Sequence, residues 1–565
     1  PSLLILDGDQ IYADHLPGPL IRHLTRFGNE LMGWQESIPG ISTPLADIPV
    51  NGRQELALRK ANFTSEAAQN QLMGFGEYAA LYLLAWNVEN WPHTWPAFPE
   101  ESQAEAEDLL HEATHLGKAL SPLDQTPEQA YAEKIGILER VRDGVPAVRR
   151  LLANIPTYMM FDDHDITDDL FITRKWKQAV WDSPTGRRIV TNGLAAAWAF
   201  QCWGNEPDRY PPDFIEAVFN HLQAQAGDKA LAETYESKIW NFRDWTYSLP
   251  VHPTTIVMNT RTQRAYDGDE DAPRLIDQQG LEELHKSARR AGYQRGDPLI
   301  LVSPAPVVGY ETVEGMQELV NHYIGPYKFD VESWRANLDG YVSLFKFIIS
   351  EFAPRCVVFV SGDVHYGFTI SATFTWQGKS LPVVQLTSSA LKNAGLALEV
   401  IGLSSLFAGR TDRHFAWESL AEKANQAEAG TFPEPATPLP AQSAKHSGKV
   451  RGRSVHILPD EQAPMPATFS PISGLEGPGA VKGRLVWQDA RTFEPTWGFR
   501  SLPIVGDNNL GLVRFRSGNL LVHRLLAPTE AGTRSSTAMV ATVPGEVVLE
   551  RISQNPQESD GGGLD

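Results

Sequence analysis

The chain has 565 residues, of which 42% are hydrophobic and 21% charged, the composition of an ordinary globular protein. Its 49 Lys and Arg stand against 69 Asp and Glu, and the resulting charge of −20 excludes general electrostatic attraction to nucleic acid or an anionic membrane. No run reaches the ~18 consecutive apolar residues of a membrane-spanning helix, and two cysteines, Cys202 and Cys356, are too few for a zinc knuckle or a disulfide framework.

The chain opens directly on an apolar run, Leu3–Leu6, which predicts a buried strand. Because a natural chain begins with Met, and a domain rarely begins at its core, we expect a preceding portion that holds a further strand of the fold. Any export signal would lie there too. The compartment therefore stays open between a periplasmic or secreted location and the cytoplasm.

Further apolar runs predict strands that are buried on both faces of a sheet. They lie at residues 157–161, 255–258, 299–302 and 356–360. Helical periodicity occurs between them, at residues 130–154, 281–291 and 341–352. This alternation predicts an α/β layered fold, in which ligands gather beyond the carboxyl ends of the strands.

Longer stretches depart from the alternation. Residues 60–150 and 175–247 have helical patterns and are interpreted as large helical insertions that cap or line a cleft. Residues 368–376 alternate in polarity and are followed by Gln-Gly-Lys and a second apolar run, which predicts an antiparallel hairpin.

The predicted core thus spans residues 1–395. An irregular linker is expected over residues 396–480, because the stretch 421–450 is rich in Ala, Pro, Glu and Ser. Residues 481–550 are expected to form a β segment that packs on the core, and residues 551–565 a disordered tail.

Acidic residues and histidine follow the apolar strands at three places. The segments are Asp7-Gly-Asp9-Gln-Ile-Tyr12, Asp162-Asp163-His164-Asp165 and Gly362-Asp363-Val-His365. Burying such charges is costly unless they are paired or bound to metal. Each segment alone has a structural explanation: a turn with a buried tyrosine, a solvated loop that caps a helix, or a core histidine. Their joint occurrence, each after a separate strand, favours a metal site.

The order Gly-Asp-x-x-Tyr, Asp-Asp-His-Asp, Gly-Asp-x-His resembles the calcineurin-like metallophosphoesterase superfamily, in its alkaline phosphatase D (PhoD-like) branch. The resemblance covers about residues 1–395 and includes the segments Asn259-Thr-Arg261 and Val302-Ser-Pro304. It implies a layered sandwich of two central mixed β-sheets flanked by helices.

The resemblance also implies roles for individual residues. Asp9 would bridge two metal positions, and Tyr12 would bind ferric iron as a tyrosinate. Asp163, Asp363 and His365 would complete the ligand set. Because two aspartates make the second position rich in oxygen, Ca²⁺ is expected at that position, paired with the Fe³⁺ that Tyr12 would bind. His164 would contact the substrate phosphate and assist the leaving oxygen.

Other assignments stay open. Arg261 is a candidate clamp for a phosphate oxygen, with a surface salt bridge as the alternative. The superfamily's first ligand motif would precede Pro1, and its remaining histidine ligand is not assigned, with His252 and His322 as candidates that also suit structural roles.

The predicted function is hydrolysis of phosphate monoesters or diesters by a metal-activated hydroxide, and the expected substrates are small molecules. An inactive binding or scaffold protein with the same fold is the alternative. A serine hydrolase that uses Ser303 or Ser361 is disfavoured, because neither residue lies in a Gly-x-Ser-x-Gly turn. The sequence does not indicate the oligomeric state.

Overall fold

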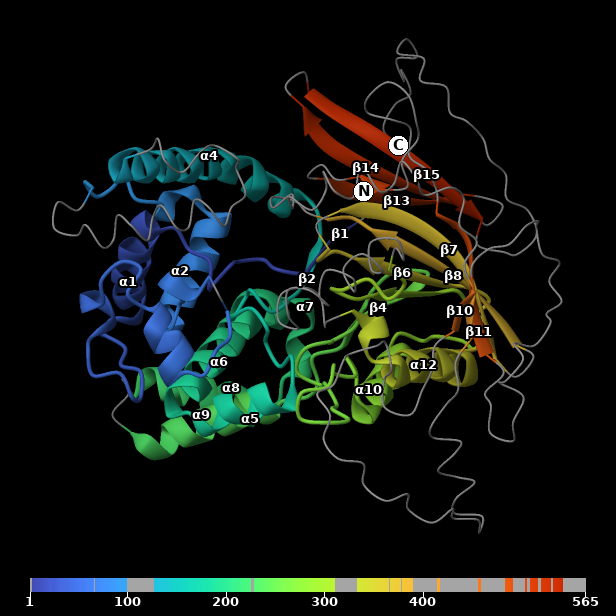
Figure 1. Ribbon diagram of the computed structural model, residues 1–565, viewed down its shortest axis with the longest axis horizontal. Coiled ribbons are helices and arrows are strands. Elements are labelled where there is room, and N and C mark those ends of the chain that lie inside the picture. Colours follow the sequence, from blue (N-terminus) through green and yellow to red (C-terminus); the bar gives the residue numbers. More distant parts are fainter. Residues whose placement is uncertain are drawn as a thin grey trace.

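The structure is a computed structural model that describes residues 3–65, 67–98, 126–224, 228–309, 333–364, 366–376, 379–389 and 509–516, together with short strands in the C-terminal part. Most of the helices gather on one side of the molecule, and the β-sheets lie on the other side together with α10 (Gln278–Arg290) and α12 (Leu338–Phe347) (Figure 1). Among the described residues, no helix has the length and apolar character needed to cross a membrane.

Two short parallel strands connect the sides. β1 (Leu4–Asp7) pairs with β2 (Thr157–Met160), with Asp7 opposite Met160. Because the strands run in parallel, their carboxyl ends lie at the same edge. The loops that follow them, which carry the first two acidic segments, therefore leave from one place.

The largest sheet is mixed and has ten strands. Its central strands β4 (Thr254–Val257), β5 (Leu299–Val302), β6 (Val357–Ser361) and β8 (Lys379–Thr387) are parallel. β3 (Tyr247–Leu249) pairs antiparallel with β4, and β7 (Gly367–Trp376) with β8. The strands predicted from the apolar runs, and the antiparallel hairpin, are confirmed.

The same sheet continues through strands from the C-terminal part. They are β9 (His414–Ala416), β10 (His456–Leu458), β11 (Gly483–Ala490) and β12 (Ile504–Val505). Otherwise residues 396–480 lie outside the described residues, as do residues 551–565, so the linker and the disordered tail stay predictions.

A separate antiparallel sheet is formed by β13 (Leu510–Arg516), β14 (Leu520–Thr529) and β15 (Gly532–Ala541). It contacts the large sheet through Leu521, which packs in one apolar cluster with Val358 and Val384. The hydroxyl of Thr369 on β7 also lies 2.8 Å from Nδ1 of His523 on β14.

The helices of the helical side have the following bounds: α1 (Gly18–Met32), α2 (Phe75–Trp86), α4 (Pro127–Asn154), α5 (Arg174–Asp182), α6 (Pro184–Ala197), α7 (Trp203–Asn205), α8 (Pro212–Gln223) and α9 (Lys229–Asn241). α10 (Gln278–Arg290) and α12 (Leu338–Phe347) lie beside the large sheet (Figure 1). A π-helical turn, Trp198–Cys202, links α6 to α7. The mixed α/β class is confirmed, whereas the domain division stays a prediction.

Glycine permits one close crossing on the helical side. A Cβ on Gly28 of α1 would lie 2.6 Å from the carbonyl carbon of Gly76 in α2. The two helix backbones therefore touch where neither residue has a side chain. This contact anchors α2, which approaches the acidic loops with its C-terminal half.

Candidate metal centre

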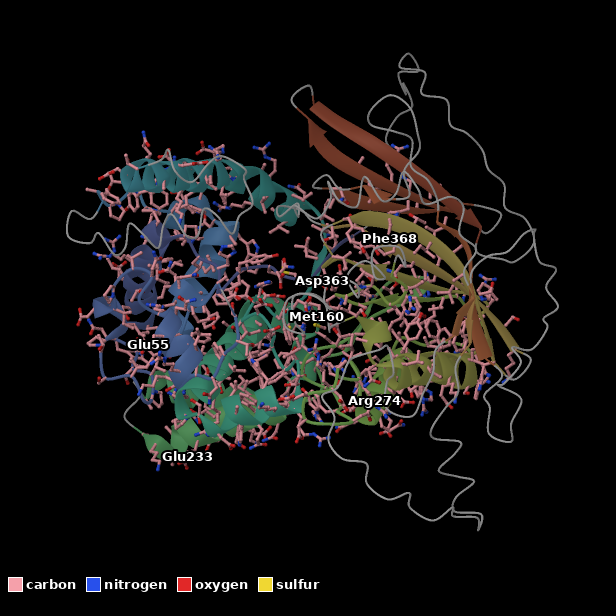
Figure 2. All side chains as sticks on the ribbon, in the orientation of Figure 1. Glu55, Met160, Glu233, Arg274, Asp363 and Phe368 are labelled. Atoms are coloured by element: carbon pink, nitrogen blue, oxygen red, sulfur yellow. The ribbon has the colours of Figure 1, made fainter. Side chains whose placement is uncertain are left out.

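Three loops converge at the carboxyl ends of β1, β2 and β6. A Cβ on Gly362, the residue after β6, would lie 2.8 Å from the backbone oxygen of Asp7 at the end of β1. Only glycine allows this approach, and it brings Asp363 beside the first loop. Met160, at the end of β2, and Asp363 both lie near the centre of Figure 2, where the sheets meet the helical side.

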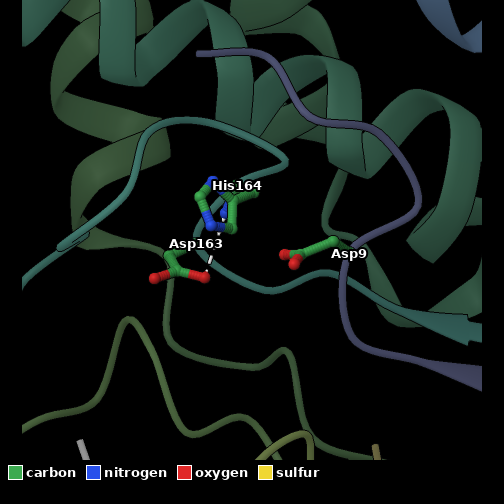
Figure 3. Close-up of side chains that lie close together, drawn as sticks. All are labelled: Asp9, Asp163 and His164. Atoms are coloured by element: carbon green, nitrogen blue, oxygen red, sulfur yellow. Dashed lines mark hydrogen bonds between the residues drawn. The ribbon is translucent and has the colours of Figure 1, made fainter. Parts of the chain in front are cut away.

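Asp9, Asp163 and His164 form a group that could hold a metal ion, because one ligand atom from each lies within 4.8 Å of the others. Figure 3 shows the two carboxylates on either side of the imidazole. Asp9 comes from the loop after β1, and the other two come from the loop after β2. The structure thus brings together three of the residues that the sequence singled out.

Three carboxylates in and around this group each have a buried oxygen with no hydrogen-bond partner among the residues that the structure describes: Oδ2 of Asp7, Oδ1 of Asp9 and Oδ2 of Asp162. Burial raises the pKa of Asp7 well above its usual value, and the charges of Asp162 and Asp363 add to the effect. Burial also raises the pKa of Asp9, which His164 partly opposes. A cation would satisfy these oxygens, so the donor set fits a metal.

Asp363 has a left-handed backbone conformation, with φ of 65°. Aspartate tolerates this region better than most residues, and such a turn ends the strand sharply. The charge of Asp363 acts on both Asp7 and Asp9, so it belongs to the same acidic centre. His365 lies outside the described residues.

The imidazole of His164 is hydrogen-bonded to the carboxylate of Asp14. Its Nδ1 lies 2.8 Å from Oδ1 of Asp14, which is fully buried and also accepts hydrogen bonds from Ser65 and from the amide of Asp168. Burial opposes ionisation of Asp14, but His164 and these donors lower its pKa to about 2. Burial likewise opposes charge on His164, yet Asp14 and Asp9 raise the imidazole pKa well above its usual value.

Tyr12 lies against the same imidazole. The ring centroids of Tyr12 and His164 are 4.4 Å apart, and the planes are inclined by 24°. Tyr12, the predicted iron ligand, therefore lies next to the candidate metal group, because its ring stacks on one member of that group, His164.

Arg261 is buried, with 2% of its surface exposed, so the surface salt bridge considered from the sequence is wrong. Its Nε donates to Oδ1 of Asp162, and one terminal nitrogen lies 3.2 Å from Oδ1 of Asp163. Asn259 fixes this turn, because its Oδ1 accepts from the amides of Arg261 and Thr262. In this structure Arg261 orders the acidic loop, while contact with a substrate phosphate stays a prediction.

Sequence reasoning gave no role to Asp7, Asp14, Asp162 or Asp165. Asp7 and Asp162 could have been noticed, because Asp7 is the last residue of β1 and Asp162 lies two residues after β2, each shortly before a predicted ligand. The partnership of Asp14 with His164 had no signal, since it spans 150 positions of the chain.

The remaining candidates lie elsewhere. His252 is exposed and precedes β4, at the opposite end of that strand from Arg261. His322 is outside the described residues. The hydroxyl of Ser303 is fully buried and donates to the carbonyl of Ala305, and that of Ser361 accepts from Gln385. Neither serine is presented to a substrate.

No family model matches the chain, and no curated protein matches it. A solved structure described as "Structure of PhoD" aligns with 69% of this chain at 9% sequence identity and a TM-score of 0.29. The alignment covers 57% of that protein, so the chain spans little more than half of its length. A likeness at this level establishes neither a family nor an activity.

Proposed function

We propose that the chain is a metal-dependent phosphoesterase, a PhoD-like metallophosphoesterase as the motifs of the sequence imply. One observation carries the proposal: the acidic loops after β1 and β2 meet around an imidazole, the charge of Asp363 acts on them, and within the described part of the chain three of their buried carboxylate oxygens have no hydrogen-bond partner. A centre with this excess of negative charge would repel a phosphate ester unless cations were bound there.

The donor set suits hard cations. Asp9 and Asp163 supply two carboxylate ligands, which leaves coordination positions for water and substrate, and we assign the imidazole of His164 beside them to the substrate. We further propose that Fe³⁺ binds beside Tyr12, and that a second metal ion, the divalent Ca²⁺, binds near Asp163, Asp363 and His365. When bound, such cations lower the pKa of water from ~15.7 towards neutrality and offset charge on the phosphate.

The residues of the chain would position and protonate the substrate. Because Asp14 accepts a hydrogen bond at Nδ1, His164 presents Nε2 to the centre, from which a protonated imidazole can donate to the leaving oxygen. Arg261 keeps Asp162 and Asp163 in place. The acidic surroundings favour the protonated imidazole, and a bound cation would act in the opposite direction.

The test combines metal analysis with two substrates. Purified protein is assayed for bound iron and calcium, and for hydrolysis of p-nitrophenyl phosphate and bis-p-nitrophenyl phosphate before and after chelation. We expect chelator-sensitive hydrolysis, and a visible tyrosinate-to-iron band that disappears in Tyr12→Phe. Activity that resists chelation in iron-free protein would contradict the proposal. Bound metal without hydrolysis of either ester would favour the binding-protein alternative.

A further inference from the structure

Asp165 is a buried carboxylate on which several structural segments converge. It has no exposed surface, and it accepts hydrogen bonds from three backbone amides and two side chains. The donors are the amides of Gln10 (3.2 Å), Ile11 (3.2 Å) and Asp162 (3.0 Å), the hydroxyl of Tyr82 (2.9 Å) and the side-chain amide of Gln201 (3.0 Å).

The backbone donors belong to both loops of the candidate metal group. Gln10 and Ile11 directly follow Asp9, whereas Asp162 directly precedes Asp163. A single carboxylate therefore ties the loop after β1 to the loop after β2. Since backbone amides cannot rotate away independently, their bonds to Asp165 fix where the neighbouring side chains leave the backbone.

The side-chain donors come from the helical side. Tyr82 lies on α2 and Gln201 on the turn between α6 and α7, and the Gln201 amide also donates to the Tyr82 hydroxyl at 2.8 Å. The Tyr82 ring stacks on Phe200, with centroids 5.2 Å apart and planes inclined by 10°. The helices thus hold the carboxylate rigidly against the loops.

We propose that Asp165 is a positioning residue that sets the separation of Asp9 from Asp163 and His164, and that Tyr82 transmits the packing of the helical side to this separation. The inference rests on the proposed function only for its metal readout. It assigns no contact between Asp165 and metal or substrate.

A matched pair of tyrosines on α2 provides the test. Tyr78 and Tyr82 are both fully buried, one helical turn apart, and both hydroxyls donate hydrogen bonds. The Tyr78 hydroxyl bonds the carbonyls of Leu72 and Ile166 at 3.1 Å each, whereas that of Tyr82 bonds Asp165. Tyr82→Phe and Tyr78→Phe therefore delete the same atom from the same helix, but only the first removes a hydrogen bond to the Asp165 carboxylate.

Two readouts are measured on the full chain: Mn²⁺ affinity by calorimetry, and hydrogen exchange of the amides of Gln10, Ile11 and Asp162. We expect Tyr82→Phe to weaken Mn²⁺ binding about tenfold, and Asp165→Asn about 10- to 100-fold, the range for residues that orient ligands. Exchange at the three amides should accelerate in both variants. Tyr78→Phe should lower the melting temperature without either effect.

The outcomes separate this inference from the proposed function. Equal changes of affinity and exchange in the two tyrosine variants, or no change in either, would overturn the positioning role. If the wild-type chain binds no Mn²⁺, the proposed function fails, and exchange at Gln10 and Ile11 still decides whether Asp165 holds the loops. Should Asp165→Asn fail to fold, the tyrosine pair alone gives the answer.

Discussion

At the scale of single residues, Asp9 is the carboxylate whose charge most needs a bound cation. One of its oxygens is buried and has no hydrogen-bond partner in the described ranges, and burial raises the pKa of this carboxyl well above its usual value. Asn keeps the shape but removes the negative charge that a cation requires.

We therefore expect Asp9→Asn to abolish turnover and to lower bound metal, while the fold stays intact. The measurements are initial rates with p-nitrophenyl phosphate, metal content, and near-ultraviolet circular dichroism. Asp143→Asn is the control, since that carboxylate is exposed and lies on α4, outside the three loops. Near-wild-type rates for Asp9→Asn would argue strongly against the proposed function.

The sequence could predict site residues only where they belong to a short motif of adjacent positions. Asp9, Asp163 and His164 each follow a buried strand within a short acidic segment, and the structure brings them together. Asp14 and Asp165 act through partners distant in the chain, such as His164 and Tyr82. No local pattern specifies such partners, because they are set by how the helices pack.

At the scale of elements, the crossing of α1 and α2 depends on the absence of side chains at Gly28 and Gly76. Gly28→Ala would place a methyl group 2.6 Å from the Gly76 carbonyl carbon, a contact that backbone atoms can relieve only by moving apart. We expect a loss of about 1–3 kcal/mol in the free energy of unfolding, measured by urea denaturation.

Gly144→Ala on α4 provides the matched control. Its Cβ would meet nothing within 4 Å, so the change should leave stability unaltered or raise it by up to about 1 kcal/mol through helix propensity. A similar loss in both variants would show that the crossing is not the cause.

The contact between β7 and β14 gives a pH-dependent prediction. Burial lowers the pKa of His523 to about 4, below the ~6.5 of an unfolded histidine. As the pH falls below ~6.5, the unfolded chain takes up a proton that the folded protein refuses. The stability from this residue is therefore complete above that pH and is lost progressively towards pH 4.

His523→Gln keeps a polar partner for Thr369 but cannot titrate. We expect the stability difference between wild type and this variant to change by about 2 kcal/mol between neutral pH and about pH 5, at the expense of the wild type. Urea denaturation at both pH values measures it. A difference that is independent of pH would mean that His523 has the same pKa in the folded protein as in the unfolded chain.

The sequence predicted the central strands well, because continuous apolar runs between turns have few other interpretations. Residues 299–302 coincide with β5 of the large sheet, and residues 157–161 nearly coincide with β2 of the two-stranded sheet. The pairing of β13, β14 and β15 into a separate sheet was not predicted, since pairing depends on partners rather than on the pattern within one strand.

At the scale of the whole molecule, the net charge of −20 and the buried acidic centre both make the folded protein less stable as carboxylates ionise. Burial raises the pKa values of Asp7 and Asp9 above those of the unfolded chain. Their contribution to stability is therefore present at low pH and is lost as the pH rises through the folded values. Metal-free protein should therefore become less stable as the pH rises towards the values at which these carboxylates ionise.

A cation that binds the folded protein alone reverses this loss, by about 2.7 kcal/mol at a concentration 100 times its dissociation constant. We expect Mn²⁺ to raise the melting temperature of chelator-treated protein, and to raise it more at about pH 8 than at about pH 5, because ionised carboxylates bind it more tightly. Differential scanning calorimetry at both pH values measures the shift. In Asp9→Asn the shift should shrink at both values, with the larger reduction at the higher pH. A shift that is the same at both pH values, or unaltered in that variant, would mean that the cation binds outside the three loops.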